Sequence, residues 1–137
     1  MSDSTLIACV DDASSVTDAL KGLLSALGFR CSMFASAEGL LESGQLAEIT
    51  CIIADVQLPG MSGLELHEQL IRSGRPIPVI LITGFPDERI KARALSAGVI
   101  SYLVKPVPKD ELIGSIRAAF AKLGRSDDPG TPSESGR

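Results

Sequence analysis

The sequence predicts an α/β domain in which five parallel strands form a doubly wound sheet covered by five helices. Two observations support this fold class. Short apolar runs alternate along the chain with segments of helical periodicity, and two of the runs are apolar throughout, as in strands buried on both faces. Right-handed crossovers between parallel strands favour the order 2-1-3-4-5. With 137 residues, of which 45% are hydrophobic, the chain is long enough for one domain with a core.

Apolar runs that end at polar or turn-forming residues define the strands. The predicted strands are 5–10, 29–34, 50–55, 77–83 and 100–104. The runs 50–55 and 77–83 are the continuously apolar ones, so they are expected at the centre of the sheet. Pro78 fits only the start of its strand, because proline cannot donate a hydrogen bond to a neighbouring strand.

Helical spacing of apolar residues, with capping and stop residues, predicts the helices. The predicted helices are 14–28, 36–43, 62–72, 86–98 and 108–124. Ser15 with Asp18 resembles a capping box in the first helix, and Ser62 with Glu65 forms a second one. Pro86 fits the first turn of its helix. In the last helix, the buried stripe is expected to comprise Leu112, Ile113, Ile116, Phe120 and Leu123.

Composition bounds the domain and its location. Residues 1–124 are expected to form one domain, and the polar segment 125–137, rich in Pro, Gly and Ser, a disordered tail or linker. The net charge of −4 and the lack of a basic stripe argue against direct nucleic-acid binding. No apolar stretch is long enough to span a membrane, and no basic region precedes the first apolar run, so we expect a cytoplasmic protein.

Polar and charged residues follow the strands at the points where these end. Asp11 and Asp12 follow the first strand, Asp55 ends the third, Thr83 ends the fourth and Lys105 follows the fifth. Each alone is commonplace in a turn or a cap. Because the carboxyl ends of parallel strands meet at one edge of the sheet, where such folds bind ligands, the five together favour a functional site.

The chemistry of this set favours phosphoryl transfer. Three neighbouring carboxylates repel one another when ionised, and a hard divalent cation such as Mg²⁺ relieves that repulsion. A carboxylate such as Asp55 can attack phosphorus and carry the phosphoryl group as an acyl phosphate. Lys105 could pair with one phosphoryl oxygen as a point charge, and Thr83 could donate a hydrogen bond to another.

Four motifs resemble a known family. In order along the alternating chain, "VDD", "ADVQLPGMSG", "LITG" and "YLVKP" are similar to the motifs of a response regulator receiver domain, a flavodoxin-like fold of two-component signalling. The resemblance covers about residues 5 to 123. "PGMSGLEL" and "LITG" most resemble the FixJ-type subgroup.

The resemblance implies how the site is used. Asp55 would be the phosphoacceptor, with a sensor histidine kinase or a phosphotransfer protein as the donor. Asp11, Asp12, Asp55 and the backbone carbonyl of Gln57 would hold Mg²⁺. The Lys105–Pro106 peptide bond would be cis, an isomer that is plausible only before proline.

The resemblance also implies a switch. Thr83 and Lys105 would contact the phosphoryl group, and Tyr102 would respond to the movement of Thr83, its ring turning inward. The surface that changes its protein contacts, or its self-association, would be formed by the helix 86–98, the strand 100–104 and the helix 108–124.

Two residues depart from the family pattern. Gln57 stands where many FixJ-type members carry a basic residue, and Phe85 places a bulky apolar group near the mouth of the crevice. Both flank the expected phosphoryl site, so they bear on the lifetime of the acyl phosphate.

Several functions remain open at this point. A stand-alone switch that catalyses only its own phosphorylation and dephosphorylation is favoured over an enzyme. The alternative is a receiver cut from a longer DNA-binding transcriptional regulator. An aspartyl-nucleophile phosphatase would need an Asp-x-Asp-x-Thr pattern, which neither "DDASS" nor "DVQLP" supplies. A flavin carrier would need a Ser-, Thr- and Gly-rich loop after the first strand, where this chain has acids.

Overall fold

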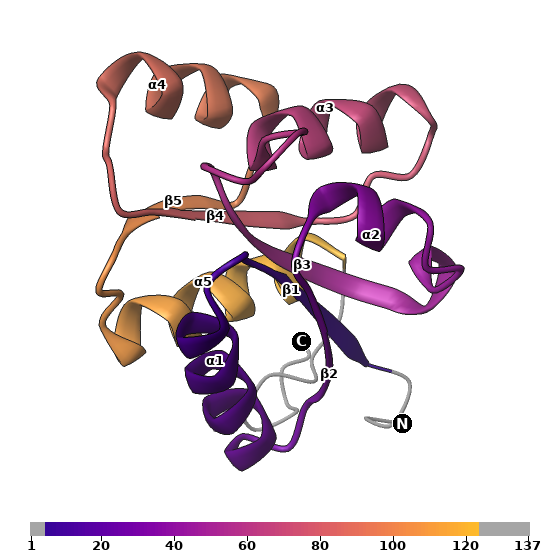
Figure 1. Cartoon of the computed structure of the whole chain (residues 1–137), viewed down its shortest axis with the longest axis vertical. Helices are drawn as coiled ribbons and strands as arrows, with labels where there is room; N and C mark the ends of the chain where they lie inside the picture. Colours follow the sequence, from indigo (N-terminus) through magenta and orange to yellow (C-terminus); the bar gives the residue numbers. More distant parts are fainter. Residues whose placement is uncertain (1–4, 124–137) are drawn as a thin grey trace.

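A computed structural model describes residues 5–123, in which strands and helices alternate along the chain. The elements are β1 (Leu6–Val10), α1 (Ser14–Ala26), β2 (Arg30–Phe34), α2 (Ala37–Leu41), the 3₁₀ turn η2 (Leu46–Glu48), β3 (Ile49–Asp55), α3 (Gly63–Arg72), β4 (Val79–Thr83), α4 (Glu88–Ala97), β5 (Ser101–Val104) and α5 (Lys109–Lys122). All strand pairs are parallel, in the order β2-β1-β3-β4-β5 (Figure 1). The predicted fold class and strand order are confirmed. The predicted tail, 125–137, lies outside the described residues.

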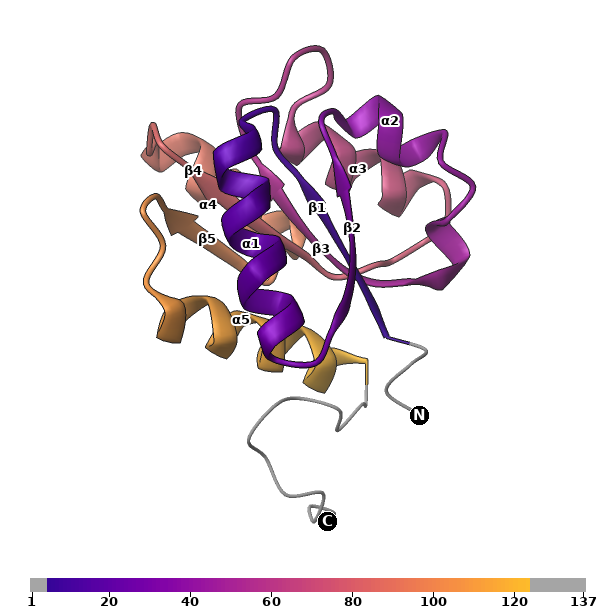
Figure 2. The same cartoon turned by 60° about the horizontal axis from the view of Figure 1, so that its bottom comes forward.

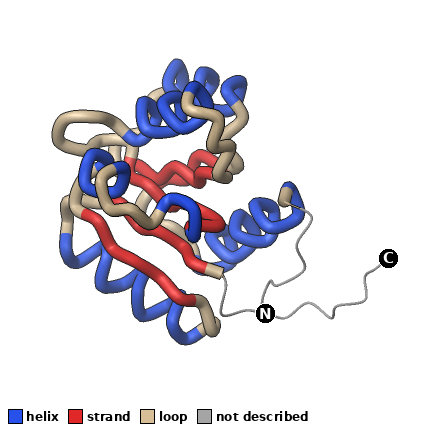
Figure 3. The backbone as a smooth tube through the Cα atoms, turned by 90° about the vertical axis from the view of Figure 1, so that its right-hand side faces the viewer, coloured by secondary structure: helices blue, strands red, loops and turns tan. Residues whose placement is uncertain are grey.

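The sheet lies between two layers of helices. Figure 1 shows α2, α3 and α4 on one face, and α1 and α5 on the other, where Figure 2 brings them forward. The tube view in Figure 3 shows the twist of the strands. Successive residues of β1 alternate between the two hydrophobic cores: Ala8 packs with the α2–α4 layer, whereas Ile7 and Cys9 pack with the α1–α5 layer.

The strands β3 and β4 are buried along their whole length, as their continuous apolarity predicts. Each therefore carries its last residue to the edge of the sheet with apolar packing on both faces behind it. Those last residues are Asp55 and Thr83. The fold thus fixes two polar side chains at the ends of rigid, buried strands.

One predicted helix cap and one predicted helix start are wrong. The helix α1 begins at Ser14, as predicted, but its N-cap Ala13 makes no side-chain capping bond, and the Ser15–Asp18 capping box does not form. The backbone N–H of Ala13 instead donates to the Asp11 carboxylate, so the loop before α1 is set by that acid. The helix α4 begins at Glu88, two residues after Pro86, and its N-cap is Asp87, whose carboxylate accepts from two N–H groups of the first turn.

Of two further local predictions, one is confirmed and one is wrong. The capping box of Ser62 and Glu65 is present at α3, with both of its hydrogen bonds. In α5, Leu123 was expected to be buried but is 43% exposed, since it follows the last helical residue. Within the described residues, no helix is long and apolar enough to cross a membrane.

The three cysteines are free thiols in the first three strands. Cys9 and Cys51 are fully buried, and burial raises the pKa of Cys51 to about 12. Both thiols therefore stay protonated and act as small core residues. His67 is likewise packed in the buried face of α3, where loss of solvent lowers its pKa.

Candidate functional site

The register of the sheet gathers the predicted site residues at one edge. The residue before Asp11 pairs with the residue before Asp55, so the two acids lie side by side at the tips of β1 and β3. At the tips of β4 and β5, the backbone N–H of Lys105 donates to the carbonyl oxygen of Thr83 at 2.8 Å. The peptide bond that follows Lys105 is cis, as predicted.

A lysine bridges the two buried acids. The ammonium nitrogen Nζ of Lys105 lies 2.8 Å from Oδ2 of Asp11 and 2.6 Å from Oδ2 of Asp55. The side chains of Asp11 and Asp55 are 1% and 8% exposed, and that of Lys105 is 23% exposed. The ion pairs are thus largely withdrawn from water, so removal of Lys105 would leave two buried carboxylates uncompensated.

Backbone N–H groups hold the second oxygen of each buried acid. Oδ1 of Asp11 accepts from the N–H of Ala13 at 2.9 Å, and Oδ1 of Asp55 accepts from the N–H of Gln57 at 2.8 Å. Each acid therefore presents one oxygen to its own loop and the other to Lys105. This arrangement fixes the orientation of both carboxylates.

Burial and the ion pairs act on the titration of the site in opposite directions. Burial raises the pKa of Asp55 above its ordinary value, although the bonds from Lys105 and from the Gln57 N–H act against it. Burial on its own would lower the pKa of Lys105, but hydrogen bonds to Asp11 and Asp55 outweigh it, and that pKa is raised. Lys105 is consequently a stable cation beside an acid that is costly to ionise.

The same edge carries more negative than positive charge. Carboxylate oxygens of Asp11, Asp12 and Asp55 all lie within 4.8 Å of one another. Lys105 pairs with two of these acids; Asp12 is exposed and has no hydrogen-bond or ion-pair partner among the described residues. Three clustered carboxylates with one ammonium fit a hard divalent cation that takes oxygen ligands. The contribution of the Gln57 carbonyl oxygen to such a site stays a prediction.

The hydroxyl of Thr83 makes two hydrogen bonds within the protein. Thr83 is fully buried, and its Oγ donates to Oε1 of Gln57 at 2.6 Å and accepts from the N–H of Phe85 at 3.0 Å. Phe85 itself is 75% exposed. Thr83 therefore lies close to the predicted phosphoryl site, with its one proton directed at a neighbouring loop.

Tyr102 is already buried in this structure. Its ring packs in the core between the sheet and the α2–α4 layer, and its hydroxyl accepts from the N–H of Asp87 at 3.0 Å. The expected inward turn of the ring is thus not the motion that is open to it. The hydroxyl thus ties the ring to the loop before α4.

Two contacts at the site were missed by sequence reasoning. The family resemblance implied a backbone metal contact for Gln57 and an effect on the lifetime of the acyl phosphate, but not that its side chain bonds to Thr83. The carboxylate of Glu38 in α2 accepts from the N–H of Met61 at 2.8 Å, which lowers the pKa of Glu38 and ties α2 to the loop after β3. Nothing in the local pattern of either residue signals a bond to a segment more than 20 positions away.

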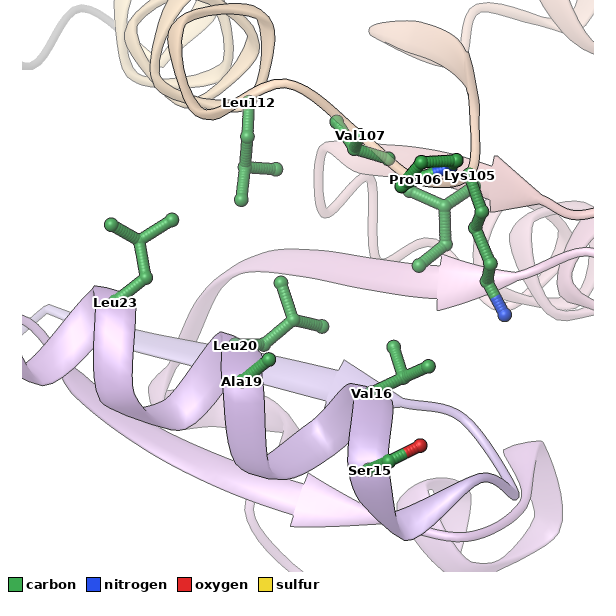
Figure 4. Close-up of a pocket in the computed structure, with 10 residues that line it drawn as sticks. Ser15, Val16, Ala19, Leu20, Leu23, Lys105, Pro106, Val107 and Leu112 are labelled. Carbon is green, nitrogen blue, oxygen red and sulfur yellow. The ribbon is translucent and has the colours of Figure 1, made fainter.

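An apolar groove borders the site between α1 and α5. It has a volume of about 550 Å³ and is lined by Val16, Leu20 and Leu23 of α1 and by Val107 and Leu112 on the opposite side (Figure 4). Lys105 forms part of its rim. Apart from Lys105, the residues that line the groove carry no ionisable side chain, so the charged groups of the site all lie at the strand tips.

Comparison with known proteins agrees with this geometry. A family model described as the response regulator receiver domain matches residues 7–117. The response regulator protein TodT of Pseudomonas putida F1 is 37% identical over 132 residues, which cover 94% of this chain and 58% of TodT. The transcriptional regulatory protein FixJ of Azorhizobium caulinodans is 34% identical over 130 residues, which cover 95% of this chain and 60% of FixJ.

The solved structure of the response regulator StyR has a TM-score of 0.81 and 34% sequence identity, over 88% of this chain and 61% of StyR. The similarity to FixJ confirms the predicted FixJ-type resemblance. The chain spans about three fifths of the length of TodT and FixJ.

The raised pKa of Asp55 predicts how stability depends on pH. The folded state holds this proton more tightly than the unfolded chain, so the stability gained is present below the ordinary aspartate pKa and is lost as pH rises through the raised value. Asparagine has no such proton to lose. We expect Asp55→Asn to increase the free energy of unfolding at pH 7 by an amount on the order of 1 kcal/mol, and to increase it less as pH falls toward 4.

Urea denaturation of wild type and variant between pH 4 and 7 measures this difference. Glu42→Gln, which alters an exposed carboxylate after α2, serves as the control and should show no comparable dependence. An Asp55→Asn protein that is less stable than wild type at pH 7 would contradict the raised pKa of Asp55.

Proposed function

Because the chain belongs to the response regulator receiver domain family, we propose that it is a signalling switch that accepts a phosphoryl group on Asp55. The observation that carries the proposal is the position of Asp55: a buried acid at the tip of a rigid strand, 2.6 Å from an ammonium and beside two more carboxylates. The donor is a sensor histidine kinase or a phosphotransfer protein. Such a switch is not an enzyme acting on a separate substrate.

The transfer uses the electrons of the Asp55 carboxylate. One carboxylate oxygen attacks phosphorus, the phosphorus–nitrogen bond of the donor phosphohistidine breaks, and the nitrogen keeps the electron pair as the imidazole leaves. The product is an acyl phosphate on Asp55. Attack of water on that phosphorus later returns the carboxylate and releases inorganic phosphate. No oxidant or reductant takes part.

The neighbouring residues have distinct roles in this transfer. Lys105 is a point charge that pairs with a phosphoryl oxygen, since its ammonium already lies against the accepting carboxylate. Asp11 and Asp12, with Asp55 and the carbonyl oxygen of Gln57, would hold Mg²⁺, which supplies positive charge that offsets the charge on the transferring group. The hydrogen bond from Ala13 keeps Asp11 oriented toward the site.

The signal leaves the site through Thr83. Phosphorylation adds negative charge and acceptor oxygens, to which the Thr83 hydroxyl turns. The N–H of Phe85 then loses its acceptor, and the loop before α4 is free to move. That loop contacts Tyr102 through the N–H of Asp87, so the change reaches the surface formed by α4, β5 and α5, where an output protein or a second copy binds.

Two forms of output fit this switch. One is a stand-alone regulator that acts through protein contacts or a phosphorelay. The relatives TodT and FixJ are longer than the matched region, and FixJ is a transcriptional regulatory protein, which supports the alternative of a receiver within a longer DNA-binding regulator. The mass of the protein in its native cells, compared with 14.3 kDa for this chain, decides between the two forms.

Phosphorylation of Asp55 is the direct test of the proposal. Incubation with acetyl phosphate and Mg²⁺ should add one phosphoryl group, detected by intact-protein mass spectrometry, and chelation of Mg²⁺ should prevent it. Asp55→Asn should remain unlabelled, because an amide is a poor nucleophile toward phosphorus. Labelling of the Asn variant to the wild-type extent would falsify the assignment of Asp55.

Tyr102 should report the switch optically, since it is the only tyrosine and the chain has no tryptophan. We expect its fluorescence or near-ultraviolet circular dichroism to change on phosphorylation, because its hydroxyl contacts the loop that moves. Thr83→Ala should suppress the change while Asp55 is still phosphorylated. A signal that stays constant in fully phosphorylated wild type would rule out this route but leave Asp55 as acceptor.

A further inference from the structure

Gln57 touches both halves of the proposed switch. Its backbone N–H donates to Oδ1 of Asp55 at 2.8 Å, and its side-chain Oε1 accepts from the hydroxyl of Thr83 at 2.6 Å. The residue is exposed, whereas Asp55 and Thr83 are buried. A single surface residue, Gln57, therefore connects Asp55 to the Thr83 hydroxyl, which in the proposed switch binds the phosphoryl group on Asp55.

The hydroxyl of Thr83 has only one proton to donate. In this structure the proton goes to Gln57, while the oxygen accepts from the N–H of Phe85. A phosphoryl oxygen on Asp55 would need the same proton. The two acceptors exclude each other, so the Thr83–Gln57 bond must break before Thr83 can bind the phosphoryl group.

We propose that Gln57 is a latch: a positioning residue whose side-chain carbonyl holds the Thr83 hydroxyl in the resting state and sets the free energy needed to engage it on phosphorylation. The inference rests on the proposed function, because it assumes that Thr83 moves to a phosphoryl group at Asp55. It assigns to the Gln57 side chain a task separate from any metal contact of its backbone.

The latch also holds the loop between β4 and α4. While the Thr83 hydroxyl donates its hydrogen bond to Gln57, its Oγ stays placed to accept from the N–H of Phe85. The N–H of Asp87 donates to the hydroxyl of Tyr102. The loop is thus held at two points, one of which depends on Gln57. Removing the latch weakens the resting arrangement without touching the acceptor acid, the lysine or the clustered carboxylates.

Gln57→Met tests the latch, since methionine has a similar length and no amide oxygen. Without the amide oxygen of residue 57, the proton of the buried Thr83 hydroxyl has no acceptor in the resting state. The phosphoryl-bound state, in which that proton goes to a phosphoryl oxygen, is unchanged. Beryllofluoride with Mg²⁺, a mimic of the acyl phosphate, is the probe, and its bound form is titrated by fluorine-19 nuclear magnetic resonance. We expect Gln57→Met to bind it roughly three- to tenfold more tightly than wild type, the range for one net hydrogen bond.

Two controls separate the latch from a general effect of the substitution. Gln69→Met, in α3, removes an amide whose Oε1 accepts from the exposed Arg72, and it should leave the affinity unchanged. In a Thr83→Ala background there is no hydroxyl to release, so adding Gln57→Met should change nothing.

Unchanged or weaker binding by Gln57→Met overturns the latch. A gain of the same size in the Thr83→Ala background also overturns it, because Gln57 would then act by blocking access. Wild type that binds no beryllofluoride refutes the proposed function itself, and the latch with it.

Discussion

The buried ion pairs of Lys105 with Asp11 and Asp55 are the interaction on which the rest of the site depends. They place one ammonium against two acids that are almost entirely removed from water. Without that cation, two uncompensated charges would remain at the tip of an apolar sheet, a costly arrangement. With it, three carboxylates still face a single ammonium, a surplus of two negative charges when all three are ionised, which a divalent cation would offset.

The fold supplies the rigidity that this arrangement needs. Asp11 follows β1, and Asp55 and Thr83 end β3 and β4. All three strands are buried, so the backbone at these residues is held in place by packing. Polar loops complete the geometry by donating N–H groups to the outer oxygens of the acids. The parts expected to rearrange on phosphorylation are the side-chain contacts of Thr83 and the exposed loop before α4, which is held by hydrogen bonds to Thr83 and Tyr102. In the proposed switch, stability and switching thus depend on different parts of one sheet edge.

Sequence patterns were sufficient to predict the fold and to predict which residues meet at the tips of the strands. Continuous apolarity located β3 and β4, and the parallel order then brought Asp11, Asp55 and Lys105 together without any structural information. What the sequence could not show were contacts between side chains of distant loops. The bond between Thr83 and Gln57, and the burial of Tyr102 before any modification, depend on rotamers and loop paths that no local spacing encodes. The predicted Ser15–Asp18 capping box of α1 failed for a related reason: Asp11, a site residue, accepts from the N–H of Ala13 and so shapes the turn that precedes the helix.

A divalent cation is expected to balance the surplus of negative charge at the strand tips. Titration of Mg²⁺ by isothermal calorimetry measures this with wild type, Asp12→Asn and the control Asp110→Asn in the exposed first turn of α5. We expect saturable binding to wild type and to the control, and binding to Asp12→Asn that is weaker by roughly tenfold or more, because one charged ligand is lost. Equal affinity in all three proteins, or none in wild type, would contradict this expectation.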